Sequence, residues 1–451
     1  MTAASQDAVD AFDRMIALFF EYSPDTGAAL SQALETDPDL VMGRCVQGYF
    51  AQLVGNAAAL PQADTALAAA EAQAESATGR ERLHVDALRS WCARDLAGAV
   101  DRWEAILIDH PRDLVALKLA QFGHLYLGDP ANIRDCIARV MPAWDESVPH
   151  YSNVLGMRAF GFEESGDYPA AETAGRRAID LNPKDPYAVH AVAHVMEMQD
   201  RHREGIAWIE GLEPHWGDCN NYRFHLWWHC SLYYLACEDF DSVIRLYDEK
   251  IRAEKTDQIR DITNAVALLL RLQYRDIDVG DRWDELAEKC AGRIDEHLLP
   301  FHDTHFLLAV AFGGRPDAAQ AMVESMRSFV ATQSGSAVPV MRDISIPLAE
   351  AVMAYCSGDY AQAVDRLMPI RYGIQRIGGS HAQRDLYAEM LIEAALKCGR
   401  YDLARALLAE RSALQPGNPQ TWRRFAQALE GAGDAAAAQN ARDKAEALLA
   451  A

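Results

Sequence analysis

Apolar residues recur at every third or fourth position along almost the whole chain, and no long alternating run predicts a strand. This period is typical of α-helices that bury one face. A turn is expected at Pro61, and the segments around it carry no clear repeat signature. Helices are predicted there over residues 7–22, 26–36, 41–54 and 63–75. The sequence therefore predicts an all-α protein with an irregular N-terminal part.

Helix pairs joined by short turns follow from about residue 79 onward, and segment 152–183 is the clearest of them. Its turn is Gly166-Asp167-Tyr168, its small residues are Ala171 and Ala178, and Pro183 closes it. Small residues let paired helices approach closely, and a proline ends the second helix. Similar turns recur near residues 358, 399 and 433. This pattern resembles the tetratricopeptide repeat, a helix–turn–helix unit of about 34 residues.

The expected organisation is a right-handed tetratricopeptide-repeat superhelix over residues 79–451, on which the helices of residues 1–78 pack. About nine helix pairs fit into this part of the chain. By resemblance to known repeats, the first helix of each pair lines the concave surface. About ten pairs close most of a superhelical turn, so we expect the groove to become a pocket lined by the repeats of about residues 152–400.

Two pairs of histidines are the main candidates for chemistry. His190 and His194 are four residues apart, and so are His225 and His229. On a helix this spacing puts both rings of a pair on one face, one turn apart. The two pairs are separated by about one repeat length, so neighbouring repeats would bring all four rings together. Glu197 follows His194 by three residues and stays near the same face.

Three interpretations of this cluster stay open. In the first, histidines act as general acid and base near neutral pH, and carboxylates orient them. The catalytic candidates are His190, His194, Glu197, His225, His229, Asp303 and His305. In the second, the four paired histidines bind zinc or another divalent metal, with Glu197 as a ligand or a general base, although the His-Glu-x-x-His order of zincins is absent. In the third, the rings are hydrogen-bonded residues of the core.

Further polar and aromatic residues are candidates for binding a substrate. They are Trp227, Trp228, Asn264, His381, Gln383, Arg384 and Asp385. Only one of the two adjacent tryptophans is expected to face the pocket. Arg384 can hold a carboxylate through two parallel hydrogen bonds or form an ion pair at the surface. Asp303 and Ser380 have a simpler interpretation as helix caps.

The net charge and the absence of certain motifs argue against some classes of binding partner and cofactor. The net charge of −23 disfavours nucleic acid and anionic membranes. No glycine-rich phosphate loop and no Gly-x-Ser-x-Gly elbow is present, so no nucleotide cofactor is expected. The nine cysteines contain no Cys-x-x-Cys and are interpreted as reduced thiols of a cytoplasmic protein. No signal-peptide pattern and no apolar run of about 18 residues is found.

The chain resembles the tetratricopeptide-repeat protein 38 family in four stretches, at residues 155–164, 190–198, 225–229 and 378–385. The resemblance covers most of the chain from about residue 79 onward. It implies a soluble helical repeat array and no defined activity, so no catalytic residue is carried over from it. Its signature consists of His, Glu, Arg and Asp as well as packing residues, which favours a functional site.

The sequence thus predicts a protein that binds a small polar molecule in a histidine-rich pocket inside the superhelix. An enzyme of hydrolase or lyase type is expected, with His and Glu acid–base chemistry or metal-assisted chemistry. The alternative is a non-catalytic scaffold that binds a partner peptide in its concave groove. A third possibility is an array that zinc stabilises. A homodimer is compatible with the sequence, which does not require one.

Overall fold

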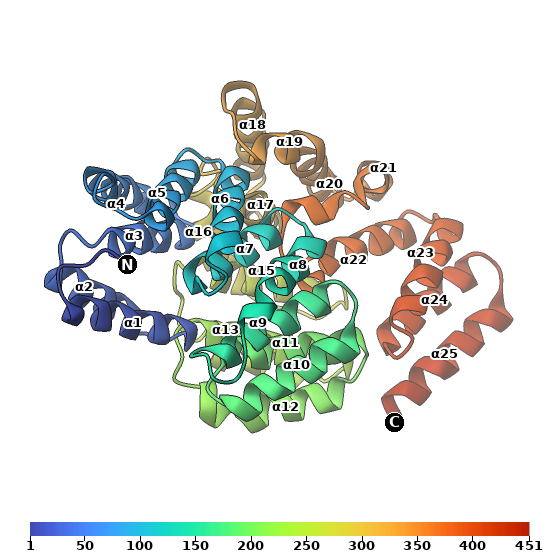
Figure 1. Cartoon of the computed structure of the whole chain (residues 1–451). Helices are drawn as coiled ribbons and strands as arrows, with labels where there is room; N and C mark the ends of the chain where they lie inside the picture. The colour runs from blue at the N-terminus through green and yellow to red at the C-terminus, as the bar shows by residue number, and fades with distance from the viewer. Residues whose placement is uncertain (451) are drawn as a thin grey trace.

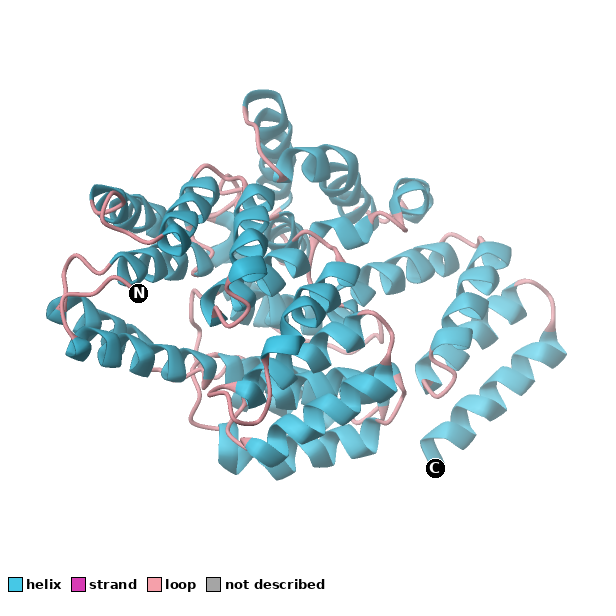
Figure 2. Cartoon of the chain, viewed as in Figure 1, coloured by secondary structure: helices cyan, strands magenta, loops and turns pink. Residues whose placement is uncertain are grey.

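The computed structural model describes residues 1–450, and all regular structure in this part of the chain is helical (Figure 2). Consecutive helices pack as antiparallel hairpins, and the hairpins stack side by side into a curved array (Figure 1). The predicted all-α solenoid of tetratricopeptide type is confirmed.

The N-terminal part contains four α-helices and one short 3₁₀ turn. Their bounds are α1 (Gln6–Phe20), α2 (Thr26–Thr36), α3 (Val41–Leu53), η1 (Ala57–Ala59) and α4 (Leu60–Ala72). The start of α4 differs from the prediction, since Pro61 lies in its first turn and not in a loop before it. Proline is favourable there, because the backbone N–H that it lacks has no partner in the first turn of a helix.

The repeats follow as regular helical pairs. Their bounds are α5 (Gly79–Cys92), α6 (Leu96–Asp109), α7 (Leu114–Tyr126), α8 (Pro130–Val140), η2 (Met141–Ala143), α9 (Tyr151–Glu164), α10 (Tyr168–Leu181), α11 (Pro186–Met198), α12 (His202–Trp216), α13 (Tyr222–Ala236) and α14 (Phe240–Leu246). Asp95, Asp113, Asp129 and Asp185 each accept a hydrogen bond from a backbone N–H in the first turn of the next helix. Such a cap stabilises a helix by about 1 kcal/mol, so these aspartates fix where the helices begin.

The second half continues the array with more irregular connections. Its elements are η3 (Tyr247–Ile251), α15 (Ile259–Gln273), α16 (Arg282–Ala291), α17 (Pro300–Phe312), α18 (Pro316–Thr332), α19 (Ala337–Val340), η4 (Met341–Ser345), α20 (Ile346–Cys356), α21 (Tyr360–Ile370), η5 (Ile374–Ile377), α22 (His381–Lys397), α23 (Tyr401–Leu414), α24 (Pro419–Gly431) and α25 (Ala435–Ala450). In Figure 1 the last three helices extend to one side of the array.

Two large hydrophobic clusters hold the molecule together. One joins buried residues from Phe12 to Met157, so helices α1–α3 share a core with the repeats that follow them. The other joins buried residues from Val189 to Ala428. The N-terminal helices are therefore an integral wall of the array.

The array also closes on itself through contacts between distant segments. The guanidinium of Arg94, which follows α5, donates to the backbone carbonyls of Glu296 and His297 at 3.2 and 3.4 Å. Arg293 donates to the backbone carbonyl of Gly55. The backbone N–H of Asn220 donates to the carbonyl of Tyr22 at 2.7 Å. These contacts bring the N-terminal helices against the middle of the chain, and Figure 1 shows α3 and α5 on the same side as α16 and α17.

None of the helices within residues 1–450 combines the length and the apolar character that a bilayer-crossing segment needs.

Candidate metal centre

The site lies where α9, α11, α13 and α15 stack as neighbouring helices. Helix α11 is buried along almost its whole length, and Asp185 caps its start. Close approach to α9 depends on small residues, since a Cβ on Gly156 would lie 3.1 Å from the Cβ of Ala188. Because α11 has neighbours on every side, the side chains of its two histidines are enclosed by protein.

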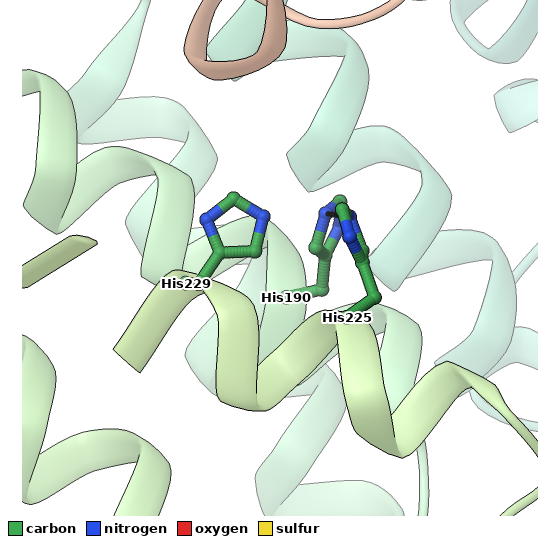
Figure 3. A group of neighbouring side chains, drawn as sticks. All are labelled: His190, His225 and His229. Carbon is green, nitrogen blue, oxygen red and sulfur yellow. Dashed lines mark hydrogen bonds between the residues drawn. The ribbon is translucent and has the colours of Figure 1, made fainter. Parts of the chain in front are cut away.

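The structure brings the four paired histidines together. Nε2 of His190 lies 3.0 Å from Nε2 of His225 and 3.0 Å from Nε2 of His194. The ring centroids of five of the six possible pairs lie 4.4 to 4.9 Å apart. Figure 3 shows His190 reaching from its own helix to His225 and His229, which lie one turn apart on α13. His190, His225 and His229 can each offer one nitrogen to a common ion.

Oxygen acceptors face the other nitrogens of three of these rings. Nδ1 of His225 lies 3.1 Å from Oδ1 of Asn264, and Nδ1 of His229 lies 3.1 Å from a carboxylate oxygen of Glu197. Nδ1 of His194 faces Glu163 at the longer distance of 3.5 Å. A ring that donates through Nδ1 keeps its lone pair on Nε2, so Asn264 and Glu197 direct the lone pairs of His225 and His229 toward the centre of the cluster.

Hydrogen bonds among the four rings cannot give every Nε2 atom a partner. With a lone pair on Nε2 of His225, Nε2 of His190 can either donate to that atom or accept a hydrogen bond from Nε2–H of His194, but it cannot do both. Nε2 of His229 is buried and has no hydrogen-bond partner among residues 1–450. A buried polar atom without a partner costs about 1–3 kcal/mol. A cation held by His190, His225 and His229 would satisfy the nitrogens of these three rings at once.

Burial keeps the rings neutral. It lowers the pKa values of His190, His194 and His225 well below the ordinary value, and the neighbouring imidazoles lower them further. Burial and then Arg271 lower the pKa of His229 to about 3. Neutral imidazole is the form that binds metal.

Two glutamates at the end of α9 extend the cluster. Glu163 and Glu164 form a second group with His194 that has the geometry to hold a metal ion. Both oxygens of Glu163 are buried and have no hydrogen-bond partner within residues 1–450. Burial, followed by Glu164 and Glu197, raises the pKa of Glu163 well above its ordinary value. No catalytic or binding role was predicted for Glu163 and Glu164, although two adjacent acids at the end of a helix are a usable signal.

The two tryptophans point in different directions. Trp228 stacks on His225 with 9° between the ring planes and 5.4 Å between the ring centroids. Trp227 packs instead against Trp216 and carries the ammonium of Lys250 over its ring. Of the predicted pair, Trp228 therefore contacts the cluster and Trp227 does not.

Asp303 and His305 lie on α17 and have other partners. The carboxylate of Asp303 lies 3.0 Å from Nδ1 of His297. Nδ1 of His305 donates to the carbonyl of Phe301 at 2.8 Å, a bond within the same helix. Neither side chain contacts the four paired histidines among the interactions of residues 1–450, so the structure does not bring these two predicted catalytic residues into the cluster.

Residues at the start of α22 divide into two groups. His381 and Arg384 reach Glu164, whose carboxylate lies 3.5 Å from Nε2 of His381 and 3.8 Å from the guanidinium of Arg384. Gln383 forms a capping box with Ser380, so its side chain has a structural partner. Asp385 was predicted to bind substrate, but both of its oxygens hold Arg411, at 2.5 and 2.7 Å.

Two adjoining cavities lead to the histidines. An inner pocket of about 100 Å³ is lined by His190 and His225 together with Tyr22, Lys118 and Arg260. A larger chamber of about 400 Å³ shares seven lining residues with it, which are Tyr22, Lys118, Phe122, Tyr126, Ile259, Arg260 and His302. The chamber lies between the N-terminal helices and the middle of the chain, so closure of the array creates it.

Comparison with known proteins reveals similarity of fold only. No family model matches it. Similar solved structures include the human IFIT1 dimer with PPP-AAAA, at 12% identity over 100% of this chain and 96% of that chain, with a TM-score of 0.43. Yeast Tom70 is similar at 13% identity over 96% of each chain, with a TM-score of 0.35, and the TPR domain of P58(IPK) at 13% identity over 82% and 98%, with a TM-score of 0.23. The class of the protein, a tetratricopeptide-repeat solenoid, follows from its own stacked helical hairpins.

Proposed function

We propose that the chain binds a divalent transition metal through His190, His194, His225 and His229 and uses it in the hydrolysis of a small molecule. One observation supports this most strongly. Nε2 atoms of the histidines point toward one centre, while Asn264 and Glu197 contact the Nδ1 atoms of His225 and His229 on the far side of the rings. An ion bound there would supply Lewis-acid chemistry.

The donor set suits such an ion. Tetrahedral zinc with nitrogen ligands at about 2.0–2.1 Å separates those nitrogens by about 3.3 Å. The two Nε2 pairs around His190 are 3.0 Å apart, which is near this value. Neutral imidazoles also bind copper, iron and nickel, so the set defines a transition-metal site without choosing one metal.

The residues around the centre also support a second proposal, that the chain belongs to the tetratricopeptide-repeat protein 38 family. The four stretches that carry the resemblance contain Glu163 and Glu164, the two histidine pairs, and His381 and Arg384. All of these residues meet around the centre. A shared sequence signature that gathers around one buried site is expected where the site is functional.

A scaffold that binds a peptide, the alternative function, would need a different shape of the array. A peptide in an extended conformation needs an open groove, whereas the contacts of Arg94 and Arg293 close the array over the chamber. Exclusion of nucleic acid rests on the net charge alone and stays a prediction.

Metal analysis of the purified protein tests the proposal. We expect a transition metal at about one ion per chain and a loss of at least about tenfold in His190→Ala/His229→Ala. His124→Ala is the matched control, since His124 is a buried histidine that pairs with Glu104 outside the centre. A wild-type protein that stays metal-free after incubation with zinc, or a double variant that keeps its metal, would contradict the proposal.

Chelation separates a catalytic ion from a structural one. Removal of the metal should abolish hydrolysis of a panel of small amides and esters, and zinc should restore it. A chelator that lowers the melting temperature while turnover of every substrate is unchanged or absent would show a structural metal and overturn the hydrolase assignment.

A further inference from the structure

The cavity that leads to the histidines has a charge opposite to that of the whole protein. The chain contains 66 Asp and Glu residues against 43 Lys and Arg residues. The lining of the chamber and the inner pocket nevertheless contains no acidic residue, while it contains Arg94, Lys118, Arg260 and Arg376. A basic cavity in an acidic protein attracts small anions over the cations that the outer surface attracts.

Two of these four cations have no hydrogen-bond or ion-pair partner among residues 1–450. The guanidinium of Arg94 is bound by the carbonyls of Glu296 and His297, and Arg376 lies 3.5 Å from Asp343. Lys118 and Arg260, in contrast, form no side-chain hydrogen bond and no ion pair with any residue of 1–450. Charged side chains enclosed by protein are normally paired, so these two leave room for an anion from outside.

Aromatic rings hold both cations at one place. The ammonium of Lys118 lies 3.3 Å from the centroid of the Tyr187 ring, and the guanidinium of Arg260 lies 5.0 Å from that of Tyr222. Tyr22 packs on Tyr222 with ring centroids 4.3 Å apart and also faces Lys118. Lys118 and Arg260 line both cavities, so they mark the junction between them.

Burial and the charge of Arg260 both lower the pKa of Lys118, while Asp185 raises it. Asp185 lines neither cavity, and its oxygens accept hydrogen bonds from Asn153 and from the backbone N–H groups of Tyr187 and Ala188. An anion between Lys118 and Arg260 would relieve the repulsion of the two cations.

Most of the other residues that line the chamber are apolar or aromatic. Its wall includes Phe19, Phe50, Trp91, Phe122 and Phe329, from helices far apart in the sequence. Its volume of about 400 Å³ lies within the range of small-molecule sites, about 300–1,000 Å³. The inner pocket of about 100 Å³ beside His190 and His225 accepts only a small group.

We infer that Lys118 and Arg260 form a carboxylate subsite, and that the substrate is a carboxylate whose apolar or aromatic body lies in the chamber and whose short polar end enters the inner pocket. Arg260 suits a carboxylate because its planar guanidinium can donate two parallel hydrogen bonds. This inference rests on the proposed function for the reaction, but binding of the anion does not depend on the metal.

Calorimetric titration with three probes that contain no hydrolysable bond tests the subsite. The probes are 3-phenylpropionate, its neutral analogue 3-phenyl-1-propanol, and 2-phenylethylphosphonate. The wild type should bind 3-phenylpropionate at least about tenfold more tightly than the alcohol, because a hydrogen bond to a charged group is worth that much. Lys118→Met and Arg260→Gln should each lose about tenfold in affinity for the acid and little for the alcohol.

Two variants serve as controls. Arg376→Gln, which removes a chamber cation that already has a partner, should bind 3-phenylpropionate like the wild type, and Lys118→Arg should retain most of the affinity. Equal binding of acid and alcohol, or an Arg260→Gln variant that folds with unchanged affinity, would overturn the subsite. Tighter binding of the phosphonate would overturn the carboxylate assignment. Metal content of the same samples reports on the proposed function separately.

Discussion

At the scale of single residues, the candidate metal centre depends on which ring nitrogen of each histidine keeps a lone pair for the ion. Asn264 and Glu197 face the Nδ1 atoms of His225 and His229 and so leave their Nε2 atoms for the centre. Trp228 stacks on His225 and restricts the rotation of that ring. The four histidines therefore form a preorganised set, and the residues behind them should affect metal affinity without touching the metal.

Glu197→Gln tests this positioning role. The amide keeps the shape of the side chain but replaces one of its two oxygens by a nitrogen that only donates, which weakens the acceptor for Nδ1 of His229, so metal affinity should fall about 10–100-fold. Competition with a chelator of known affinity measures it, and circular dichroism should show an unchanged helix content. Glu104→Gln, at the carboxylate partner of His124, is the matched control and should bind metal like the wild type. Unchanged affinity in Glu197→Gln would show that the carboxylate does not orient a ligand.

At the scale of helices, the site depends on how closely neighbouring helices approach. Gly161 on α9 faces α8, and a Cβ there would lie 2.8 Å from the Cα of Arg134 and from the carbonyl oxygen of Ile133. These are backbone atoms, which cannot turn aside as a flexible side chain does. Gly161 precedes Glu163 and Glu164 by less than one turn, so its contact with α8 also sets the position of the two carboxylates.

Alanine substitutions at two helical glycines should have opposite effects. Gly161→Ala pushes α9 from α8 and should lower the free energy of unfolding by about 1–3 kcal/mol. Gly211→Ala lies on α12 in open space and should raise it by about 0.5–1 kcal/mol, because alanine loses less backbone entropy in a helix. Urea unfolding followed by circular dichroism measures both. A Gly161→Ala variant as stable as the wild type would mean that the two helices can separate at little cost.

At the scale of the whole molecule, closure of the array turns a groove into a chamber. Arg293 donates to the carbonyl of Gly55, between α3 and α4, and pairs with Glu296. This contact joins residues 238 positions apart in the chain. The chamber is therefore a property of the closed array and does not belong to any single repeat.

Removal of the Arg293 side chain should loosen this closure. Arg293→Met leaves the carbonyl of Gly55 without a donor, which costs about 1–3 kcal/mol locally. Hydrogen exchange near residues 55 and 297 should become faster, while the helices that carry the histidines keep their protection. Arg327→Met removes an exposed arginine that pairs with Glu350 and should leave exchange unchanged. If the amides near residues 55 and 297 exchange equally slowly in Arg293→Met and Arg327→Met, closure of the array does not depend on Arg293.

Much of the helical structure could be read from local sequence. The bounds of α2 agree with the predicted range of residues 26–36, and those of α1 and α3 lie within two residues of their predicted ranges, because a local apolar stripe largely decides where a helix forms. The start of α4 was predicted wrongly, since Pro61 fits the first turn of a helix as well as a loop. The proximity of the two histidine pairs was also predictable, because it follows from the helical period and the repeat length.

The surroundings of the histidines were not predictable in the same way. Asp385 and Arg411 pair across two helices, so this predicted substrate ligand also has a partner within the protein. Glu164 and His381 meet although they are 217 positions apart. No local period encodes such contacts, because they depend on how the curvature of many repeats adds up.

The sequence by itself therefore determined the all-α repeat architecture and the set of four histidines, since both result from periods of four and about thirty-four residues. Only the tertiary structure decided which tryptophan stacks on His225, that Glu163 and Glu164 join the cluster, and that Lys118 and Arg260 meet at a cavity without acidic residues. The physical reason is that burial and pairing of a polar group depend on every element packed around it, and closure of the array sets that environment.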